Sequence, residues 1–176
     1  MKVKYFDLKN KRVFITGGGS GIGASIVEHF CEQECEVYFV DINIKESKKL
    51  ISHLKKKKIK APHFIECNLL KIKKLENIIK KIIKSKGPID ILINNAANDD
   101  RHSTKQVDEK YWNNRMDVNL KHFFFTIKAV LKGMIQKKSG AIVNLSSVSW
   151  MLGEGDKVAY ETAKSAVIGL TRSFAR

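Results

Sequence analysis

Acidic residues, cysteines and long apolar runs are all scarce in this sequence. Lysine and arginine together outnumber aspartate and glutamate by 33 to 18 among 176 residues. No stretch reaches the roughly eighteen apolar residues of a membrane span, and charges interrupt the first ten residues, which is not typical of a secretory leader. We therefore expect a cytoplasmic protein that has no membrane partner.

The cysteines, Cys31, Cys35 and Cys67, are too few and too irregularly spaced for a structural role in cross-linking. They have neither CxxC spacing nor histidines at ligand spacing, so neither a zinc site nor a disulfide framework is predicted. We expect buried, reduced thiols and no bound metal.

The net charge of +15 raises the question of a nucleic-acid partner, because clustered lysines and arginines neutralise phosphates. The run from Lys55 to Lys58 is dense, but it has no interleaved aromatic residue and no arginine that could bind base edges. The other lysines are spread over the polar faces of expected helices: Lys45, Lys48, Lys49, Lys71, Lys73, Lys74, Lys80, Lys81 and Lys84. We favour solvated helix faces over a nucleic-acid surface, with nonspecific binding to polyanions at low salt.

Short apolar runs alternate with helical patterns along the whole chain. Strands are expected over 12–16, 36–41, 62–67, 89–94 and 141–145. Helices are expected over 22–30, 44–57, from 75 to the Gly87-Pro88 stop, 107–136 and 159–176. Most of these strands are almost wholly apolar, which predicts an α/β fold with a parallel sheet covered on both faces. Without repeats or linkers, residues 1–176 are expected to form one domain.

A glycine-rich turn, TGGGSGIG at residues 16–23, follows the first expected strand and opens the first helix. Gly17, Gly21 and Gly23 permit a tight turn and let backbone N–H groups approach a pyrophosphate. A purely structural loop is the alternative, and the position between strand and helix favours the nucleotide site.

Asp41 ends the second strand, about twenty residues after the glycines, where a carboxylate can accept both hydrogen bonds of an adenosine ribose diol. It would repel a 2′-phosphate, and Ser20, Ile42 and Asn43 provide no arginine to bind one. NAD is therefore favoured over NADP as the cofactor. The alternative is an aspartate that only caps the following helix.

Tyr160 and Lys164 are four residues apart on an expected helix, so their side chains share one face. A tyrosine with an ordinary pKa of ~10 is a poor base near neutral pH, and a nearby ammonium would stabilise its phenolate. By itself this pair is more typical of a helix surface. It gains weight because Ser147 lies at the end of a strand and Asn119 lies in the preceding long helix.

Taken together, five ordered motifs resemble those of the short-chain dehydrogenase/reductase family over the whole chain: TGGGSGIG, NNAA at 94–97, VNL around Asn119, NLSS ending at Ser147, and YETAK at 160–164. The resemblance implies a Rossmann-type doubly wound sheet with five strands in the order 3-2-1-4-5, and a hydride transfer to a nicotinamide cofactor. It implies that Tyr160 is the general base, that Lys164 supports it and holds the nicotinamide ribose, and that Ser147 orients the substrate oxygen. Asn119 would anchor a water that relays the proton.

The cofactor residues implied in this way are Gly17, Ser20, Gly21, Ile22, Gly23, Asp41, Asn68, Leu69, Asn94, Ala96, Tyr160 and Lys164. Two positions depart from the family pattern. Asn68 stands where an aspartate usually faces the adenine, and an amide can still accept a hydrogen bond there. Ala97 replaces a common glycine.

The loop sequences NDDRH (98–102) and SWMLGEGD (149–156) resemble those of bacterial sugar 1-dehydrogenases, especially the D-xylose type, which oxidise an aldose to a lactone. A polyol needs several polar partners for its hydroxyls. The candidate substrate-binding residues are Asn98, His102, Ser147, Trp150, Glu154 and Tyr160. For the loop residues, solvation or capping is the alternative role.

The last helical pattern runs to the final residue without a closing glycine, asparagine or proline. Complete members of the family continue with further strands, a substrate-covering segment and much of the interface of a tetramer or dimer. We therefore expect a C-terminally truncated chain. Two hypotheses follow: an NAD-dependent aldose dehydrogenase, or a nucleotide-binding remnant without turnover, and we expect little activity from these 176 residues alone.

Overall fold

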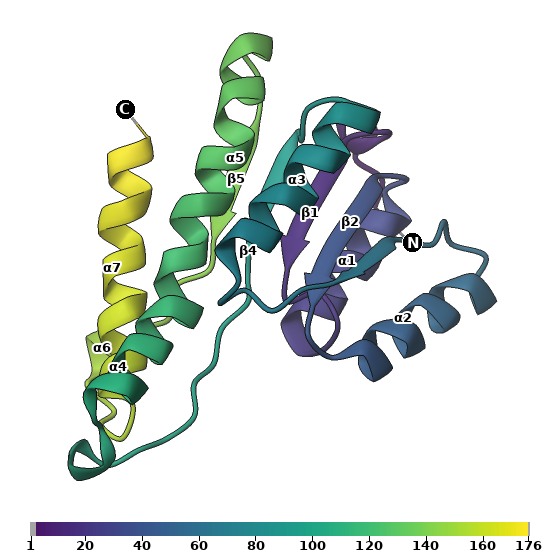
Figure 1. Cartoon of the computed structure of the whole chain (residues 1–176). Helices are drawn as coiled ribbons and strands as arrows, with labels where there is room; N and C mark the ends of the chain where they lie inside the picture. Colours follow the sequence, from purple (N-terminus) through teal and green to yellow (C-terminus); the bar gives the residue numbers. More distant parts are fainter. Residues whose placement is uncertain (1–2, 176) are drawn as a thin grey trace.

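The computed structural model describes residues 3–175 and contains one parallel sheet covered by helices (Figure 1). The strands are β1 (Arg12–Thr16), β2 (Glu36–Asp41), β3 (His63–Glu66), β4 (Ile91–Asn94) and β5 (Ala141–Asn144). The helices are α1 (Gly21–Glu32), α2 (Ile44–Lys56), α3 (Ile72–Lys86), α4 (Glu109–Met116), α5 (His122–Lys137), α6 (Ser149–Leu152) and α7 (Val158–Phe174). There are also two short 3-10 turns, η1 (Phe6–Leu8) and η2 (Thr104–Gln106). A π-helical turn, η3 (Asp117–Lys121), lies between α4 and α5.

The sheet order is β3-β2-β1-β4-β5, and every neighbouring pair is parallel, as the family resemblance implied. All carboxyl ends of the strands therefore meet at one edge. The doubly wound α/β fold is confirmed, and this edge is where such folds bind their ligands.

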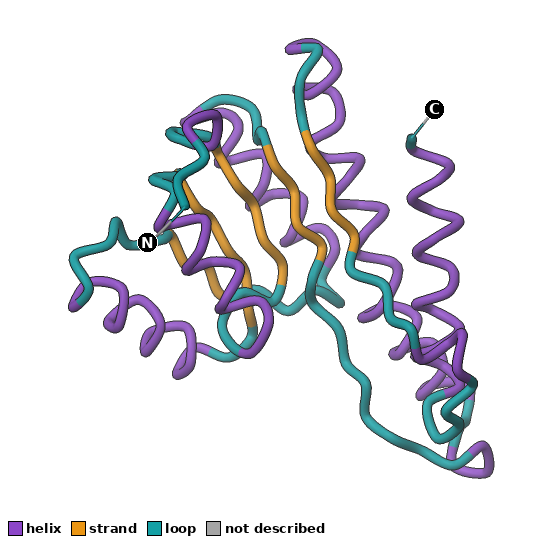
Figure 2. Tube along the Cα trace, turned by 180° about the vertical axis from the view of Figure 1, so that it is seen from behind, coloured by secondary structure: helices purple, strands orange, loops and turns teal. Residues whose placement is uncertain are grey.

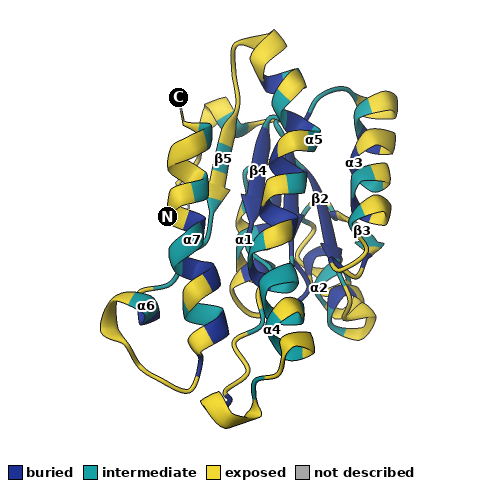
Figure 3. Cartoon of the chain, turned by 60° about the vertical axis from the view of Figure 1, so that its left-hand side comes forward, coloured by how far each residue is buried: buried dark blue, intermediate teal, exposed yellow. Residues whose placement is uncertain are grey.

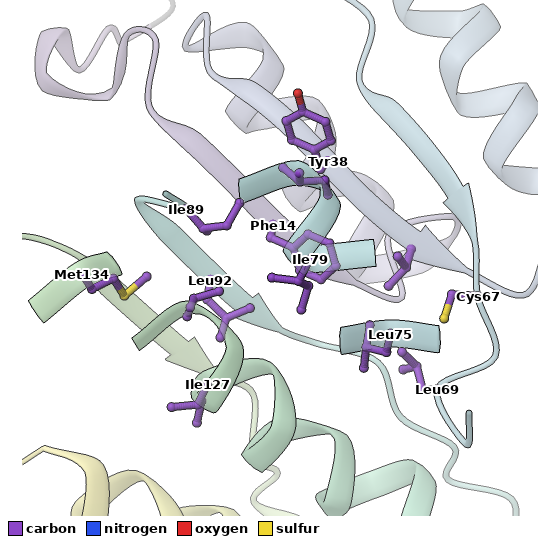
Figure 4. Close-up of a cluster of buried hydrophobic side chains, with 13 residues drawn as sticks. Phe14, Tyr38, Cys67, Leu69, Leu75, Ile79, Ile89, Leu92, Ile127 and Met134 are labelled. Carbon is purple, nitrogen blue, oxygen red and sulfur yellow. The ribbon is translucent and has the colours of Figure 1, made fainter. Parts of the chain in front are cut away.

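Alternating side chains of the central strands pack into two separate cores. Phe14 faces α3 and α5 in a cluster with Ile79, Leu92 and Ile127 (Figure 4). On the other face, Ile15 packs among residues of α1 and α2. Figure 2 shows the sheet from the side that α1 and α2 cover. Figure 3 shows the burial that results: β2 and β4 are buried and the outer helix faces are exposed.

The structure differs most from the prediction around the long helix expected over 107–136 and the segment after β5. The expected helix over 107–136 starts at Glu109, after Asp108 accepts a capping hydrogen bond from the Tyr111 N–H at 2.7 Å. It is then interrupted by η3 before α5 begins, because one extra residue enters the helical turn there. The helix α6 was not predicted, since a single turn has no visible periodicity.

Within the described residues, all three cysteines are free and buried. Burial raises the pKa of the Cys31 thiol to about 12 and that of Cys35 to about 11. None of the helices in residues 3–175 is long and apolar enough to cross a membrane.

Candidate active site

A cavity of about 540 Å³ opens at the carboxyl edge of the sheet. It is lined by the turn after β1, the ends of β2 and β5, the segments that follow β3 and β4, and one face of α7. Its residues are Gly17, Ser20, Gly21, Ile22, Gly23, Val40, Asp41, Ile42, Cys67, Asn68, Leu69, Asn95, Ala96, Ala97, Asn98, Asp99, Val118, Leu145, Ser146, Tyr160 and Lys164. All but one of the predicted cofactor residues are among them.

The glycine turn can be formed only without side chains. A Cβ on Gly23 would lie 1.8 Å from the carbonyl oxygen of Gly17, and a Cβ on Gly17 would lie 2.8 Å from Ala96. Gly17 also has a φ of 68°, which a side chain disfavours. The turn is thus packed against the segment that follows β4, and this packing brings its backbone to the floor of the cavity.

The N-terminus of α1 opens directly into the cavity. Ser20 occupies the N-cap position but makes no side-chain capping bond. The first-turn N–H groups of a helix have no partner within the helix, and together with the helix dipole they favour an anion. The turn therefore fits the pyrophosphate of a dinucleotide.

Asp41 supports the glycine turn rather than capping α2. Its Oδ2 accepts the N–H of Gly19 at 2.8 Å, and its Oδ1 accepts that of Asn43 at 2.8 Å. The N-cap of α2 is Asn43, whose side chain accepts the Glu46 N–H. The carboxylate lies at the cavity wall, where its remaining lone pairs can face a ribose diol.

Asn68 and Leu69 line the cavity beyond β3, as predicted for the adenine end. Asn68 is exposed, and its Oδ1 accepts the Leu70 N–H at 2.9 Å. The oxygen therefore holds the local turn. Leu69 is buried and offers an apolar surface.

Asn94 is the one predicted cofactor residue that lies outside the cavity. It is fully buried, accepting a hydrogen bond from Thr126 at 2.7 Å and donating one to Asn144 at 2.9 Å. It is the last residue of β4, and the period of two places it on the same face as Leu92, inside the core. The next residue, Asn95, lines the cavity instead.

Asn95 was missed by the sequence reasoning, although the NNAA motif contains it. Its side-chain amide donates to the carbonyl oxygens of Thr16 at 3.1 Å and Gly17 at 2.9 Å. Its backbone N–H and that of Ala96 donate to the Thr16 hydroxyl, each at 3.1 Å. Counting alternate residues from the buried Leu92 would have separated Asn94 from Asn95.

Lys164 and Tyr160 project from one face of α7 and line the cavity. The alternative, an ordinary pair on an exposed helix surface, is therefore excluded. Lys164 is only 1% exposed, and its Nζ donates to the Leu145 carbonyl oxygen at 2.7 Å. Burial lowers the pKa of this ammonium to about 8. Its Nζ lies 5.7 Å from the centroid of the Tyr160 ring and 5.2 Å from that of Phe123. Among the described residues that line the cavity, Lys164 is the only cation.

Ser147 lies just past the end of β5 but is not among the lining residues. Its Oγ is 2.9 Å from the Ser149 Oγ and accepts the Ser149 N–H at 3.2 Å. The neighbouring Ser146 lines the cavity, and its hydroxyl donates to the Lys164 carbonyl oxygen at 2.6 Å. The serine segment is thus tied to α7 and leaves the Ser147 hydroxyl beside the start of α6.

Asn119 lies in η3 and is fully buried. Its Oδ1 accepts the backbone N–H of Asn98 at 2.8 Å, and its Nδ2 donates to the Asn98 carbonyl oxygen at 3.0 Å. A carboxamide carries the same donor and acceptor pair as a peptide, so it binds Asn98 as a second backbone would. The side chain predicted to anchor a water is therefore occupied in holding the loop after β4.

Of the candidate substrate residues in the loops, only Asn98 lines the cavity. His102 is 6% exposed, with its backbone N–H donating to the Asp156 carbonyl oxygen and its Nδ1 2.8 Å from the Tyr111 hydroxyl. Trp150 is half-buried on α6, and Glu154 forms an ion pair with Lys157 at 2.6 Å. The structure therefore does not bring His102, Trp150 or Glu154 to the wall that Tyr160 occupies. Figure 1 shows the segment between β4 and α4 running away from the sheet toward α6.

Comparison with known proteins adds an independent result. The family profile described as short chain dehydrogenase matches residues 11–176. A D-xylose 1-dehydrogenase of Caulobacter vibrioides is 44% identical over 98% of this chain and 67% of its own length. A probable galactose dehydrogenase of Rhizobium meliloti is 40% identical over 96% of this chain and 66% of its own length. The solved aldohexose dehydrogenase of Thermoplasma acidophilum superposes with a TM-score of 0.85 at 30% identity, covering 97% of this chain and 62% of that one. The chain thus spans about two thirds of the length of the relatives it matches.

Proposed function

The chain belongs to the short-chain dehydrogenases, and from that premise we propose that it binds NAD and serves the oxidation of an aldose at C1 to a lactone. Enzymes of this family are oxidoreductases that use a nicotinamide cofactor. The observation that carries the proposal is a single cavity lined by the glycine turn, Asp41, Tyr160 and Lys164.

The choice of NAD rests on the charge at the ribose end. The Asp41 carboxylate lies at the cavity wall, and the lining residues near it provide no cation. A 2′-phosphate would meet this carboxylate at close range, which costs binding energy, whereas a ribose diol would donate to it. When bound, the nicotinamide ring supplies the hydride acceptor.

The proposed oxidation requires a general base and a fixed positive charge in the part of the cavity that Tyr160 and Lys164 line. In the proposed reaction Tyr160 takes the proton of the C1 hydroxyl as a C1 carbonyl forms, and a bound nicotinamide would accept the hydride from C1. The buried Lys164 ammonium lies beside the Tyr160 ring and would stabilise the phenolate that accepts this proton. We assign to Ser147 the orientation of the substrate oxygen, which requires its hydroxyl to turn away from Ser149.

The aldose substrate is supported by the two curated relatives, whose names are D-xylose 1-dehydrogenase and probable galactose dehydrogenase. Asn98 and Tyr160 line the same cavity, and the backbone of Asn98 is held at two points by Asn119. The side-chain oxygen of Asn98 accepts the Asp100 N–H at 2.9 Å, and an amide fixed in this way is suited to bind a sugar hydroxyl. We therefore propose Asn98 as the first substrate contact in this chain.

The experiment is formation of NADH, followed by its ultraviolet absorbance, with the purified chain and a panel of aldoses. NAD and NADP are tested separately, and NAD binding is measured in parallel by calorimetry. Any NAD-dependent turnover that the chain shows should fall at least about a hundredfold in Tyr160→Phe, since a general base contributes about 10²–10⁴ to the rate. NAD binding should be unchanged in this variant.

Two results would contradict parts of the proposal. A folded chain that binds NAD but oxidises no aldose would favour a nucleotide-binding role without turnover. A preference for NADP would overturn the assignment of Asp41.

A further inference from the structure

One buried histidine next to the proposed active site has no part in the reaction outlined above. His122 is the first residue of α5, directly after η3, and its side chain is fully buried. Its ring packs against that of Phe123, with centroids 4.5 Å apart, and Phe123 in turn packs against the Lys164 ammonium. A polar ring loses its hydrogen bonds to water when it is buried, so His122 needs a hydrogen-bond partner within the protein.

That partner is the Thr16 hydroxyl. The Nε2 of His122 lies 3.4 Å from the Thr16 Oγ1, a long but direct contact between two fully buried side chains. Thr16 is the last residue of β1 and immediately precedes the glycine turn. The contact therefore joins the start of α5 to the strand that leads into the cofactor cavity.

The hydrogen bonds of Thr16 fix the direction of this contact. Its oxygen accepts the backbone N–H groups of Asn95 and Ala96, each at 3.1 Å. A hydroxyl has two acceptor lone pairs and one proton, so with both lone pairs in use it can only donate to His122. The Nε2 of His122 must then be unprotonated.

In a neutral ring with an unprotonated Nε2, the proton is on Nδ1. Within the described residues Nδ1 has no hydrogen-bond partner, although the Val118 backbone favours a proton on the ring. Burial and the nearby Lys164 charge lower the His122 pKa to about 3, against a weaker opposing effect of the Val118 backbone. The ring therefore stays neutral, and it adds no second positive charge beside Lys164.

We propose that His122 is a positioning residue for the cofactor cavity: its unprotonated Nε2 accepts the Thr16 proton, which holds the Thr16 oxygen as a double acceptor for Asn95 and Ala96. Asn95 and Ala96 are packed against the glycine turn, and both line the cavity. His122 thus sets the spacing between that turn and the segment after β4. The effect on cofactor binding rests on the proposed function, whereas the hydrogen bond itself does not.

The first test is the tautomer of His122, measured by NMR on the chain with ¹⁵N-labelled histidine. The sequence has five histidines, and a His122→Gln sample assigns the signal. We expect an unprotonated Nε2 and a protonated Nδ1 at neutral pH. A protonated Nε2, or a charged ring, would overturn the proposal whether or not the chain binds NAD.

The second test compares His122→Leu with His122→Gln, because glutamine keeps an acceptor oxygen and leucine does not. We expect His122→Leu to lose amide-exchange protection at Asn95 and Ala96 and to weaken NAD binding about tenfold, the equivalent of one lost hydrogen bond. The glutamine variant should stay within about threefold of the wild-type affinity.

Val130→Ala is the control, since Val130 is also fully buried on α5 but belongs to the hydrophobic core and does not line the cavity. It should lower stability without changing NAD affinity. Equal losses in the leucine and glutamine variants, or none in either, would show that His122 only fills space. If the wild-type chain binds no NAD, the proposed function fails, and the tautomer with the amide protection still decides the role of His122.

Discussion

Replacing Lys164 by methionine should make the protein more stable, although the proposed function needs this lysine for turnover. The ammonium is 1% exposed, and burial lowers its pKa from 10.5 to about 8. Each pKa unit corresponds to about 1.4 kcal/mol, so the folded state disfavours the charge by about 3 kcal/mol. The variant loses the hydrogen bond to Leu145, which contributes about 1 kcal/mol. The net expectation is about 2 kcal/mol of added stability at pH 7.

The stabilities of the wild type and Lys164→Met should also depend differently on pH. Between pH 8 and 10.5 the unfolded chain keeps the Lys164 proton and the folded chain has released it, so wild-type stability rises with pH. Lys164→Met lacks this rise. The difference in unfolding free energy between the two proteins should therefore be largest below pH 8 and shrink toward pH 10.5, while all other groups titrate alike in both.

The measurement is urea unfolding of both proteins at pH 7 and pH 10, with NADH formation assayed in parallel. Lys48→Met, on the exposed face of α2, is the control and should change stability by less than about 0.5 kcal/mol at either pH. The reasoning would be refuted if Lys164→Met were less stable than wild type at pH 7. It would also be refuted if the difference in unfolding free energy between the two proteins did not change with pH.

Three other expectations follow from the site. Gly23→Ala should abolish NAD binding and destabilise the fold, because the added Cβ would overlap the backbone of Gly17. Gly169→Ala is the control: the position has open space around it in α7, so the free energy of unfolding should rise by about 0.5–1 kcal/mol. Calorimetry and thermal unfolding check both variants. Asp41→Asn should weaken NAD binding about tenfold and reduce the preference over NADP, and an unchanged ratio of the two dissociation constants would contradict the assignment. Asn119→Ala should cost about 2 kcal/mol of stability through its two lost bonds to Asn98, and urea unfolding would show no change if that contact were incidental.

The sheet and the glycine turn could be predicted because their signals are local. Apolar runs of four to six residues identified every strand to within two residues, and the strand-turn-helix context identified the cofactor turn. Lys164 and Tyr160 could be placed on one helix face because of their spacing of four residues, and the other family motifs pointed to a functional pair.

The remaining features depend on contacts between distant segments. The family resemblance implied that Asn119 anchors a proton-relaying water, and only the fold shows that its side-chain amide binds the backbone of Asn98. His122 carries no motif, and its role depends on Thr16, which lies 106 positions away. The loop residues His102, Trp150 and Glu154 were grouped by resemblance, but nothing in their sequence fixes which way these loops turn.

The π turn in η3 gives the long helix two unlike halves. One extra residue in a turn rotates everything after it by about 100° relative to an uninterrupted helix. Before the interruption, α4 packs with η3 against α7; after it, α5 packs against α3 and β4. One continuous stretch of helix can therefore present one side to α7 before the interruption and a different side to α3 and the sheet after it.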